Sequence, residues 1–206
     1  MKCPLCFTML RVLKDPLYYD CQFCKALVKN HKLLPSKEEE IQRYKSHNND
    51  VNDPRYQKFT APVWQYILNH CKPQHNGLDY GSGTGPVISK MLSDQGYQIK
   101  QYDPYFCRDS SALNNKYHYI ACCEVVEHFF SPIEEFVKLD KMLLPGGIFV
   151  GMTLLYNNAV DFEKWAYRKD QTHVFIYRKE TIKFIANQFN YQLLELTDRF
   201  FVFKKN

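Results

Sequence analysis

The sequence predicts an α/β fold, in which a mostly parallel sheet carries helices on both faces and a small cysteine-rich module precedes it. Three observations lead to this prediction. From residue 77 onward, short apolar strands alternate with amphipathic helices, as in parallel sheets. A glycine-rich loop at residues 81–85 joins the first of these strands to a helix. All paired cysteines fall within residues 1–35, ahead of the alternation.

Size and composition exclude several classes of protein. The chain has 206 residues, of which 45% are hydrophobic, so it can bury a core and is not disordered as a whole. The longest mostly apolar stretch, residues 148–156, falls well short of the ~20 residues of a membrane helix. We therefore expect a soluble cytoplasmic protein without a membrane partner. The net charge of +5 permits a nucleic-acid partner but does not require one.

The N-terminal module carries two Cys-x-x-Cys pairs, Cys3 with Cys6 and Cys21 with Cys24. Each pair places two sulfurs on a tight knuckle, and two knuckles supply the four ligands that tetrahedral Zn²⁺ requires. We therefore predict a structural zinc ribbon over residues 1–35. With bound zinc the net charge falls to about +3. The other cysteines are scattered, which is typical of core thiols in a reducing compartment: Cys71, Cys107, Cys122 and Cys123.

Residues 36–75 are expected to form a linker with two helices. Ser36 begins the first, because the glutamates that follow it stabilise a helix N-terminus. A polar loop at 47–54 separates it from a second helix at 55–71. In the loop region, Arg43, Tyr44, His47, Asn48 and Asn49 form either a lid over a ligand or an ordinary polar connection.

One sheet domain is expected over residues 76–206. Its strands are predicted at 77–80, 97–103, 116–123, 148–155, 191–196 and 199–204, the last two as an antiparallel hairpin at one edge. Its helices are predicted at 87–95, 131–144 and 179–190. Ser131 and Glu134 predict a capping box, with Pro132 at the first helical position. Residues 145–147, Pro-Gly-Gly, then turn the chain.

The glycine loop differs from the dinucleotide-binding fingerprint. Its spacing is Gly-x-Gly-x-Gly, and the sixth position is Pro86, which has no N–H to offer a phosphate. Asp79 precedes the loop, where a carboxylate disfavours a pyrophosphate and suits an ammonium group. Asp103 ends the second strand, 22 residues after Gly81. A carboxylate there can accept both ribose hydroxyls of an adenosine ligand, or it can simply close a turn.

With these residues in view, the chain resembles the class I S-adenosylmethionine (SAM) methyltransferases. The segments that carry the resemblance are LDYGSGTG, YDP, ACCEVVEHF and LLPGGIFVGMT, within residues 76–206. The resemblance implies a seven-stranded Rossmann-like sheet and SAM as cofactor. Ribose would bind Asp103, and Cys123 and Glu124 would line the methyl-donor site. The methionine end would lie in a cradle formed by Asp79, Tyr80, Gly81, Ser82, Gly83 and Gly85.

The chain departs from the family between Pro104 and Lys116. The family places a further strand and an adenine-contacting acid in this stretch, which is short here, and Asp109 is the candidate acid.

A second metal site is suggested by Glu124-x-x-Glu127-His128 together with the distant His173. This set resembles a divalent-metal site of ubiquinone-pathway O-methyltransferases and small-RNA 2′-O-methyltransferases. The resemblance implies a metal that orients a hydroxyl pair and lowers the acceptor pKa. The alternative is that the segment faces the cofactor or caps a helix without metal. His128 or His173, with Glu127 nearby, would then be the catalytic candidates for proton transfer.

The leading functional prediction is SAM-dependent methyl transfer to an oxygen or nitrogen of a small molecule. Residues 162–167, with Asp170 and His173, offer rings and polar groups for an acceptor pocket, or else loop packing. An RNA or protein methyltransferase that reads its substrate with the ribbon is an alternative, although no basic stripe interleaved with aromatics is present. A SAM-binding or zinc-docking protein without catalysis is the second alternative.

Overall fold

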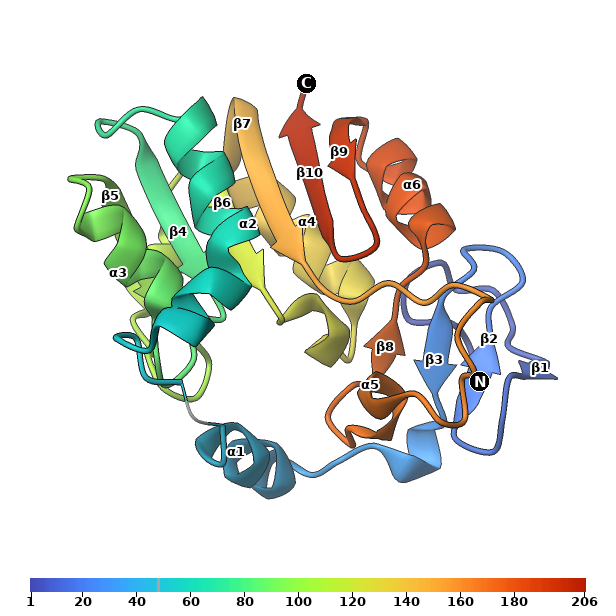
Figure 1. Cartoon of the computed structure of the whole chain (residues 1–206). Coiled ribbons are helices and arrows are strands. Elements are labelled where there is room, and N and C mark those ends of the chain that lie inside the picture. Colours follow the sequence, from blue (N-terminus) through green and yellow to red (C-terminus); the bar gives the residue numbers. More distant parts are fainter. Residues whose placement is uncertain (48) are drawn as a thin grey trace.

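The computed structural model describes residues 1–47 and 49–206. Its main feature is a central β-sheet. Among the described residues the strand order of this sheet is β5-β4-β6-β7-β10-β9. Strands β4 to β7 run parallel, and β10 runs antiparallel to both β7 and β9. The predicted α/β class and the terminal hairpin are thereby confirmed (Figure 1). The strands are β4 (Asn76–Tyr80), β5 (Gln98–Tyr102), β6 (Tyr117–Cys123), β7 (Leu143–Met152), β9 (Tyr191–Leu196) and β10 (Phe200–Lys205).

The number of strands differs from the expected seven, because six are present in the part of the chain that the structure describes. The missing strand falls between β5 and β6, where the sequence departs from the family. Residues 104–116 form a turn and a 3-10 helix, η2 (Ser110–Asn114). A parallel crossover needs roughly 10–12 residues before a further strand is added, so this connection is too short to hold one.

Helices cover both faces of the sheet (Figure 1). On one face, α2 (Pro54–His70) and α3 (Val87–Ser93) bury Ile67 and Leu92 against Val150. On the other, α4 (Pro132–Met142) and α6 (Lys179–Gln188) bury their apolar sides against Phe149 and Phe201. Neighbouring strand residues such as Phe149 and Val150 therefore belong to different cores, because successive side chains of a strand point to opposite faces. Each such buried side chain contributes about 1.5–3 kcal/mol.

Two local predictions need correction. The capping box expected at Ser131 is wrong, because the Ser131 side chain makes no cap hydrogen bond and Glu134 lines a cavity instead. The helix also ends at Met142, and residues 145–147 lie within β7 and not in a separate turn. A capping box does form at Ser36, at the start of α1 (Lys37–Lys45), where Ser36 and Glu39 each accept a backbone N–H of the other.

The N-terminal module folds into three short antiparallel strands, β1 (Val12–Leu13), β2 (Tyr18–Asp20) and β3 (Leu27–Lys29), followed by η1 (His31–Leu33). Its four paired cysteines place their sulfurs within 4.8 Å of one another. The Sγ atoms of Cys3 and Cys24 are 3.6 Å apart, and those of Cys6 and Cys21 are 3.5 Å apart. Tetrahedral zinc with 2.3 Å bonds requires sulfurs about 3.8 Å apart, so the cluster fits this ion closely.

The module is not separate from the rest of the fold. Strand β8 (Phe175–Ile176), from the C-terminal part of the chain, pairs antiparallel with β3 and completes a four-stranded sheet. Apolar side chains of the module, Leu5 and Val28 among them, belong to the same core as α6 and β10. Two ion pairs join the parts, Arg168 with Asp15 and Arg178 with Asp20. Residues 1–35 therefore share a sheet and a hydrophobic core with the C-terminal part of the chain.

Among the residues that the structure describes, none of the helices combines the length and apolarity needed to cross a membrane.

We predict that Cys21→Ser destabilises the whole chain by about 2 kcal/mol or more, because Cys21 is one of the four predicted zinc ligands and loss of a metal ligand is among the largest single-residue effects. The amides of β8 should exchange faster, since β3 supplies their hydrogen-bond partners. Thermal unfolding and amide hydrogen exchange measure both effects. Cys107→Ser, on the half-buried turn after β5, is the matched control and should leave β8 unchanged. Normal protection of β8 in Cys21→Ser would show that the module folds independently.

Candidate active site

A cavity of about 810 Å³ lies at the carboxyl ends of β4, β5 and β6. The chain passes from β4 outward to β5 and then returns to β6 on the other side of β4. Ligands of open parallel sheets bind at such a reversal of strand order. The cavity wall includes the loops at 80–84, 102–106 and 123–131. Residues from α1 and from the α5 (Ala166–Lys169) region, which lie beyond these strand ends in Figure 1, complete it.

The glycine loop forms one side of this cavity. Gly81 and Gly83 have φ of +80° and +64°, a left-handed conformation that favours glycine. A Cβ at Gly81 would lie 2.5 Å from the side chain of Val125, which has no room for it. Tyr80, Gly81, Ser82 and Gly83 all line the cavity. The Ser82 hydroxyl oxygen is buried and has no hydrogen-bond partner among the described residues.

Two of the expected cofactor residues lie outside the cavity wall. Asp79 is buried, and its Oδ2 accepts from the Oγ and backbone N of Ser89 at 2.8 and 3.3 Å. Burial raises the pKa of Asp79 to about 6. Gly85 packs against Asn49, whose carbonyl oxygen would lie 1.8 Å from a Cβ at this position. Asp79 thus ties β4 to α3, and Gly85 lets the chain before α2 approach the loop.

Asp103 lines the cavity and also organises its wall. Its Oδ2 accepts from the backbone N of Gly83 at 3.0 Å, which fastens the glycine loop to the end of β5. Its Oδ1 accepts from the backbone N of Tyr105 and Phe106, which closes the turn after the strand. By contrast, Asp109 is exposed, caps η2 through Ser111, and is not among the residues that line the cavity.

Cys123 and Glu124 line the cavity at the end of β6, beside the glycine loop. Glu124 has φ of +54°, a strained conformation for a residue with a side chain, and such strain is concentrated at functional sites. Its carboxylate lies 3.4 Å from Nη2 of Arg199, whose guanidinium packs over the Phe59 ring at 3.9 Å. Burial and the neighbouring Glu127 raise the pKa of Glu124 to about 8, against the opposing effect of Arg199.

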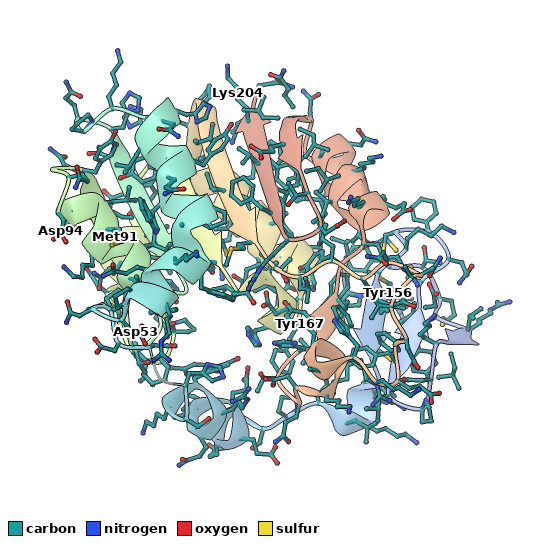
Figure 2. All side chains as sticks on the ribbon, in the orientation of Figure 1. Asp53, Met91, Asp94, Tyr156, Tyr167 and Lys204 are labelled. Carbon is teal, nitrogen blue, oxygen red and sulfur yellow. The ribbon has the colours of Figure 1, made fainter. Side chains whose placement is uncertain are left out.

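Glu127 lies on η3 (Val126–His128) and is fully buried. Its Oε1 accepts from the hydroxyl of Tyr167 at 2.6 Å, and that hydroxyl also lies 2.6 Å from Oγ1 of Thr153. Its Oε2 has no hydrogen-bond partner among the described residues. Figure 2 shows Tyr167 near the middle of the molecule, between the central sheet and the N-terminal module. Burial raises the pKa of Glu127 to about 7, although the Tyr167 hydrogen bond opposes this.

His128 and His173 face each other beside Glu127, with ring centroids 5.0 Å apart. Nδ1 of His128 is 2.8 Å from the carbonyl oxygen of Thr172, and Nδ1 of His173 is 2.7 Å from that of Tyr167. A carbonyl only accepts, so each Nδ1 carries the proton and each Nε2 keeps a free lone pair. Burial lowers the pKa of both rings, that of His173 to about 3.

The structure therefore gathers three of the four residues that the sequence suggested for a second metal. Ligand atoms of Glu127, His128 and His173 lie within 4.8 Å of one another, whereas the Glu124 carboxylate is directed to Arg199. Imidazoles that donate Nδ1–H to a carbonyl and present Nε2 are typical of metal-ligating histidines. Together with the unpaired Oε2 of Glu127, this donor set suits a divalent cation.

The lid residues and the acceptor segment both contribute to the cavity. Arg43, Tyr44, His47 and Asn49 line it, whereas Asn48 lies outside the described residues. Nη2 of Arg43 is 2.7 Å from Oδ2 of Asp170, so α1 is held against the opposite wall. Burial opposes ionisation of Asp170, but the hydrogen bonds from Arg43 and Thr172 hold its pKa below the usual range. The Tyr44 ring meets His128 edge-on, with centroids 5.2 Å apart.

Only part of the expected acceptor pocket faces the cavity. Ala166, Tyr167, Asp170 and His173 line it. Phe162 and Trp165 instead pack with Tyr156 in a separate aromatic core beside β2. The aromatic rings of this segment are therefore divided between a structural cluster and the site.

Several cavity residues were missed by the sequence analysis. Tyr56, Phe59 and Thr60 come from α2, Glu135 and Lys138 from α4, and Arg199 packs on Phe59 from the turn between β9 and β10. Helical residues without a motif give no local signal of a site. The hydroxyl of Tyr80 donates to Glu135, which links α4 to the glycine loop, and only the packing of α4 creates this contact.

We predict that Glu127 makes the folded protein less stable as the pH rises. Because its folded-state pKa of about 7 exceeds the ordinary value, its stabilising contribution is complete below about pH 4.5 and is lost as the pH rises through 7. Between about pH 5 and 7, urea unfolding without divalent cations should show a shallower decline for Glu127→Gln than for the wild type. The exposed Glu163→Gln should retain the wild-type slope. Parallel curves for all three proteins would contradict the assignment.

Comparison with known proteins identifies the family. A family model described as "Methyltransferase domain" matches residues 47–196. Among solved structures, magnesium protoporphyrin IX methyltransferase of Synechocystis PCC 6803, with bound S-adenosylhomocysteine (SAH), aligns with a TM-score of 0.59. The two chains are 14% identical, and the alignment covers 83% of this chain and 95% of that one. No curated protein matches the sequence.

Two further structures share the fold. The 1,6-didemethyltoxoflavin-N1-methyltransferase of Burkholderia thailandensis aligns with a TM-score of 0.59 at 9% identity, covering 94% of this chain and 97% of that one. A protein of Pyrococcus horikoshii OT3 aligns with a TM-score of 0.53 at 13% identity, covering 80% and 99%. These identities are low, so the structural likeness concerns the fold, whereas the family model matches the sequence itself. The chain belongs to the methyltransferase-domain family, and its fold is that of the class I SAM-dependent methyltransferases.

Proposed function

We propose that the protein transfers a methyl group from SAM to an oxygen or nitrogen atom of a small molecule. The observation that carries the proposal is that one cavity joins the glycine loop and Asp103 to Glu127, His128 and His173. SAM, when bound, supplies an electrophilic methyl group for an in-line displacement, so alignment and exclusion of water provide most of the rate. The protein must therefore hold two molecules in one enclosed space.

The residues present fit SAM in three respects. Gly83 faces open space, with no atom within 4 Å of a Cβ built there, and the buried Ser82 hydroxyl has no hydrogen-bond partner among the described residues. Asp103 stands at the end of β5, where a carboxylate accepts ribose hydroxyls. Carboxylates dominate the charged groups of the wall, which favours a ligand that carries sulfonium and ammonium charges. Cys123 and Glu124 line the same cavity as this cradle and the histidine cluster.

Support for a small acceptor comes from the size and walls of the cavity. Its volume of about 810 Å³ lies within the roughly 300–1,000 Å³ of small-molecule sites. The Arg43–Asp170 ion pair ties α1 to the segment after α5, and residues of both line the cavity, which favours a small molecule over a polymer. The Synechocystis and Burkholderia neighbours act on a porphyrin and on 1,6-didemethyltoxoflavin, as their names state.

We further propose that Glu127, His128 and His173 hold a divalent cation. The unpaired Oε2 of Glu127 and the two free Nε2 atoms fit this role. The low pKa of His173 makes it a weak proton acceptor at neutral pH, but leaves its lone pair available to a metal. A divalent ion there would supply Lewis acidity toward an acceptor hydroxyl. Separately, the sulfur cluster of the N-terminal module is proposed to hold structural zinc.

The cofactor assignment predicts that SAH binds with micromolar affinity in titration calorimetry and that NADH does not bind. Asp103→Asn keeps an acceptor for the turn but loses the charge, so SAH should bind about tenfold more weakly. Asp94→Asn, at the exposed end of α3 labelled in Figure 2, should bind as the wild type does. Equal affinities for all three proteins would remove Asp103 from the ribose site.

The acceptor class is tested with methyl-labelled SAM and a fractionated cell extract. Label should pass to the fraction of low molecular mass and should survive treatment of the extract with nuclease and protease. Label found only in RNA or protein would overturn the small-molecule assignment. SAH binding without transfer to any fraction would favour a non-catalytic SAM-binding protein.

The metal assignment predicts that Mn²⁺ binds to the wild type and about tenfold or more weakly to Glu127→Gln, as loss of the free-ion signal in electron paramagnetic resonance would show. Manganese prefers oxygen and imidazole to thiolate ligands, so the cysteine cluster does not mask the result. His75→Asn, at the distant stacked pair with His118, serves as the control. Wild-type binding by Glu127→Gln would exclude this carboxylate as a ligand.

A further inference from the structure

The segment from Tyr167 to His173 is held by hydrogen bonds from two sides. Toward the cavity, its carbonyl groups at Tyr167 and Thr172 accept from the two histidine rings. Toward the N-terminal module, three other carbonyl groups of the same segment accept from two side chains. Lys29 Nζ donates to Gln171 at 2.9 Å and to Asp170 at 3.3 Å, and the Tyr18 hydroxyl donates to His173 at 2.6 Å.

Tyr18 and Lys29 act from one place on the module. They lie directly opposite each other on β2 and β3, so their side chains emerge on the same face of the small sheet. The Lys29 ammonium is 5.5 Å from the centre of the Tyr18 ring. Tyr18 is fully buried and Lys29 is only 4% exposed. In the part of the chain that the structure describes, Lys29 has no carboxylate partner within ion-pair distance, so backbone carbonyl groups are its hydrogen-bond acceptors.

A buried ammonium group without an ion pair is costly, unlike an apolar side chain of similar length. Burial accordingly lowers the pKa of Lys29 to about 8. If this side chain served only to fill space, methionine would pack equally well at position 29. What the ammonium adds is two directed hydrogen bonds, and both end on the segment that carries His173.

The backbone makes a parallel connection. The N–H of Lys29 donates to the carbonyl of Val174, and the N–H of Val174 donates to the carbonyl of Glu127, both at 2.9 Å. Through its backbone hydrogen bonds, Val174 thus connects β3 of the module to the turn that holds Glu127 and His128. A displacement of β2 and β3 would therefore also move the two segments that carry His128 and His173.

We propose that Tyr18 and Lys29 are positioning residues, through which the N-terminal module sets the orientation and tautomer of His128 and His173. They do this by holding the carbonyl groups of Asp170, Gln171 and His173. These belong to the same short segment as the Tyr167 and Thr172 carbonyl groups, against which both Nδ1–H groups are aligned. The inference deepens the proposed function, because it rests on the two histidines being part of the working site. It also assigns the module a role beyond adding stability to the fold.

Tyr18→Phe tests the proposal, since it removes one hydroxyl and keeps the ring. Tyr117→Phe is the matched control, because the Tyr117 hydroxyl is also buried and donates to the carbonyl of Ala112 at 2.6 Å, away from the site. Both variants lose one buried hydrogen bond of the same kind and should lose similar stability. Long-range ¹H–¹⁵N spectra of the imidazoles and Mn²⁺ affinity are measured on the full-length protein.

In the wild type we expect both rings as the neutral Nδ1–H tautomer. Tyr18→Phe should shift or double the His173 signals and weaken Mn²⁺ binding about fivefold, whereas Tyr117→Phe should leave both unchanged. Lys29→Met should affect both rings and weaken Mn²⁺ binding further. Wild-type imidazole spectra in Tyr18→Phe, at a stability loss equal to that of the control, would overturn the proposal even if Lys29→Met fails to fold.

SAH calorimetry on the same samples separates this inference from the proposed function. If the wild type binds no SAH, the proposed function fails, but the imidazole spectra still decide whether Tyr18 sets the ring orientation. If SAH binds normally to all variants while the His173 signals move only in Tyr18→Phe, the module acts on the histidines and not on the cofactor cradle.

Discussion

The burial of the Glu127 carboxylate is the constraint on which the rest of the site depends. A carboxylate without solvent contact needs partners. Oε1 accepts from Tyr167, whereas Oε2 has no hydrogen-bond partner among the residues that the structure describes. Tyr167 can reach Glu127 only because α5 and the segment after it fold back over the end of β6. That segment is in turn tied to β3 through β8. Contacts through Glu127 and the segment after α5 thus connect the cavity, the histidine cluster and the N-terminal module.

The electrostatics of the cavity point to positively charged ligands. Burial raises the pKa of Glu124 and Glu127 and lowers that of both histidines, so the site favours carboxyl groups that bind protons and imidazoles that do not. The largest cause of each of these pKa shifts is the cost of burying a charge. A bound cation relieves that cost for the carboxylates and makes use of the imidazole lone pairs. The cofactor cradle and the histidine cluster are adjacent because β4 and β6 are neighbours in the sheet.

The short connection after β5 is held in place by Asp103. Asp103 bonds to the glycine loop on one side and to the following turn on the other, so a single carboxylate organises two loops that meet at the cavity. Tyr80 and Tyr102 stack beside it, and Glu135 and Lys138 of α4 complete this wall.

The sequence by itself determined the features that are local in the chain. The left-handed glycines, the carboxylate at the end of β5, the two cysteine knuckles and the alternation of strands and helices each follow from a few consecutive residues, because turn geometry and periodicity are short-range properties. The sequence also brought Glu127 and His128 together, since they are adjacent. Only the tertiary structure decided that His173 joins them and that Glu124 turns to Arg199. It also decided that β8 completes the sheet of the module, and that Tyr18 and Lys29 reach the site. These contacts join residues far apart in the chain, and they form only where the packing of the whole fold brings the segments together.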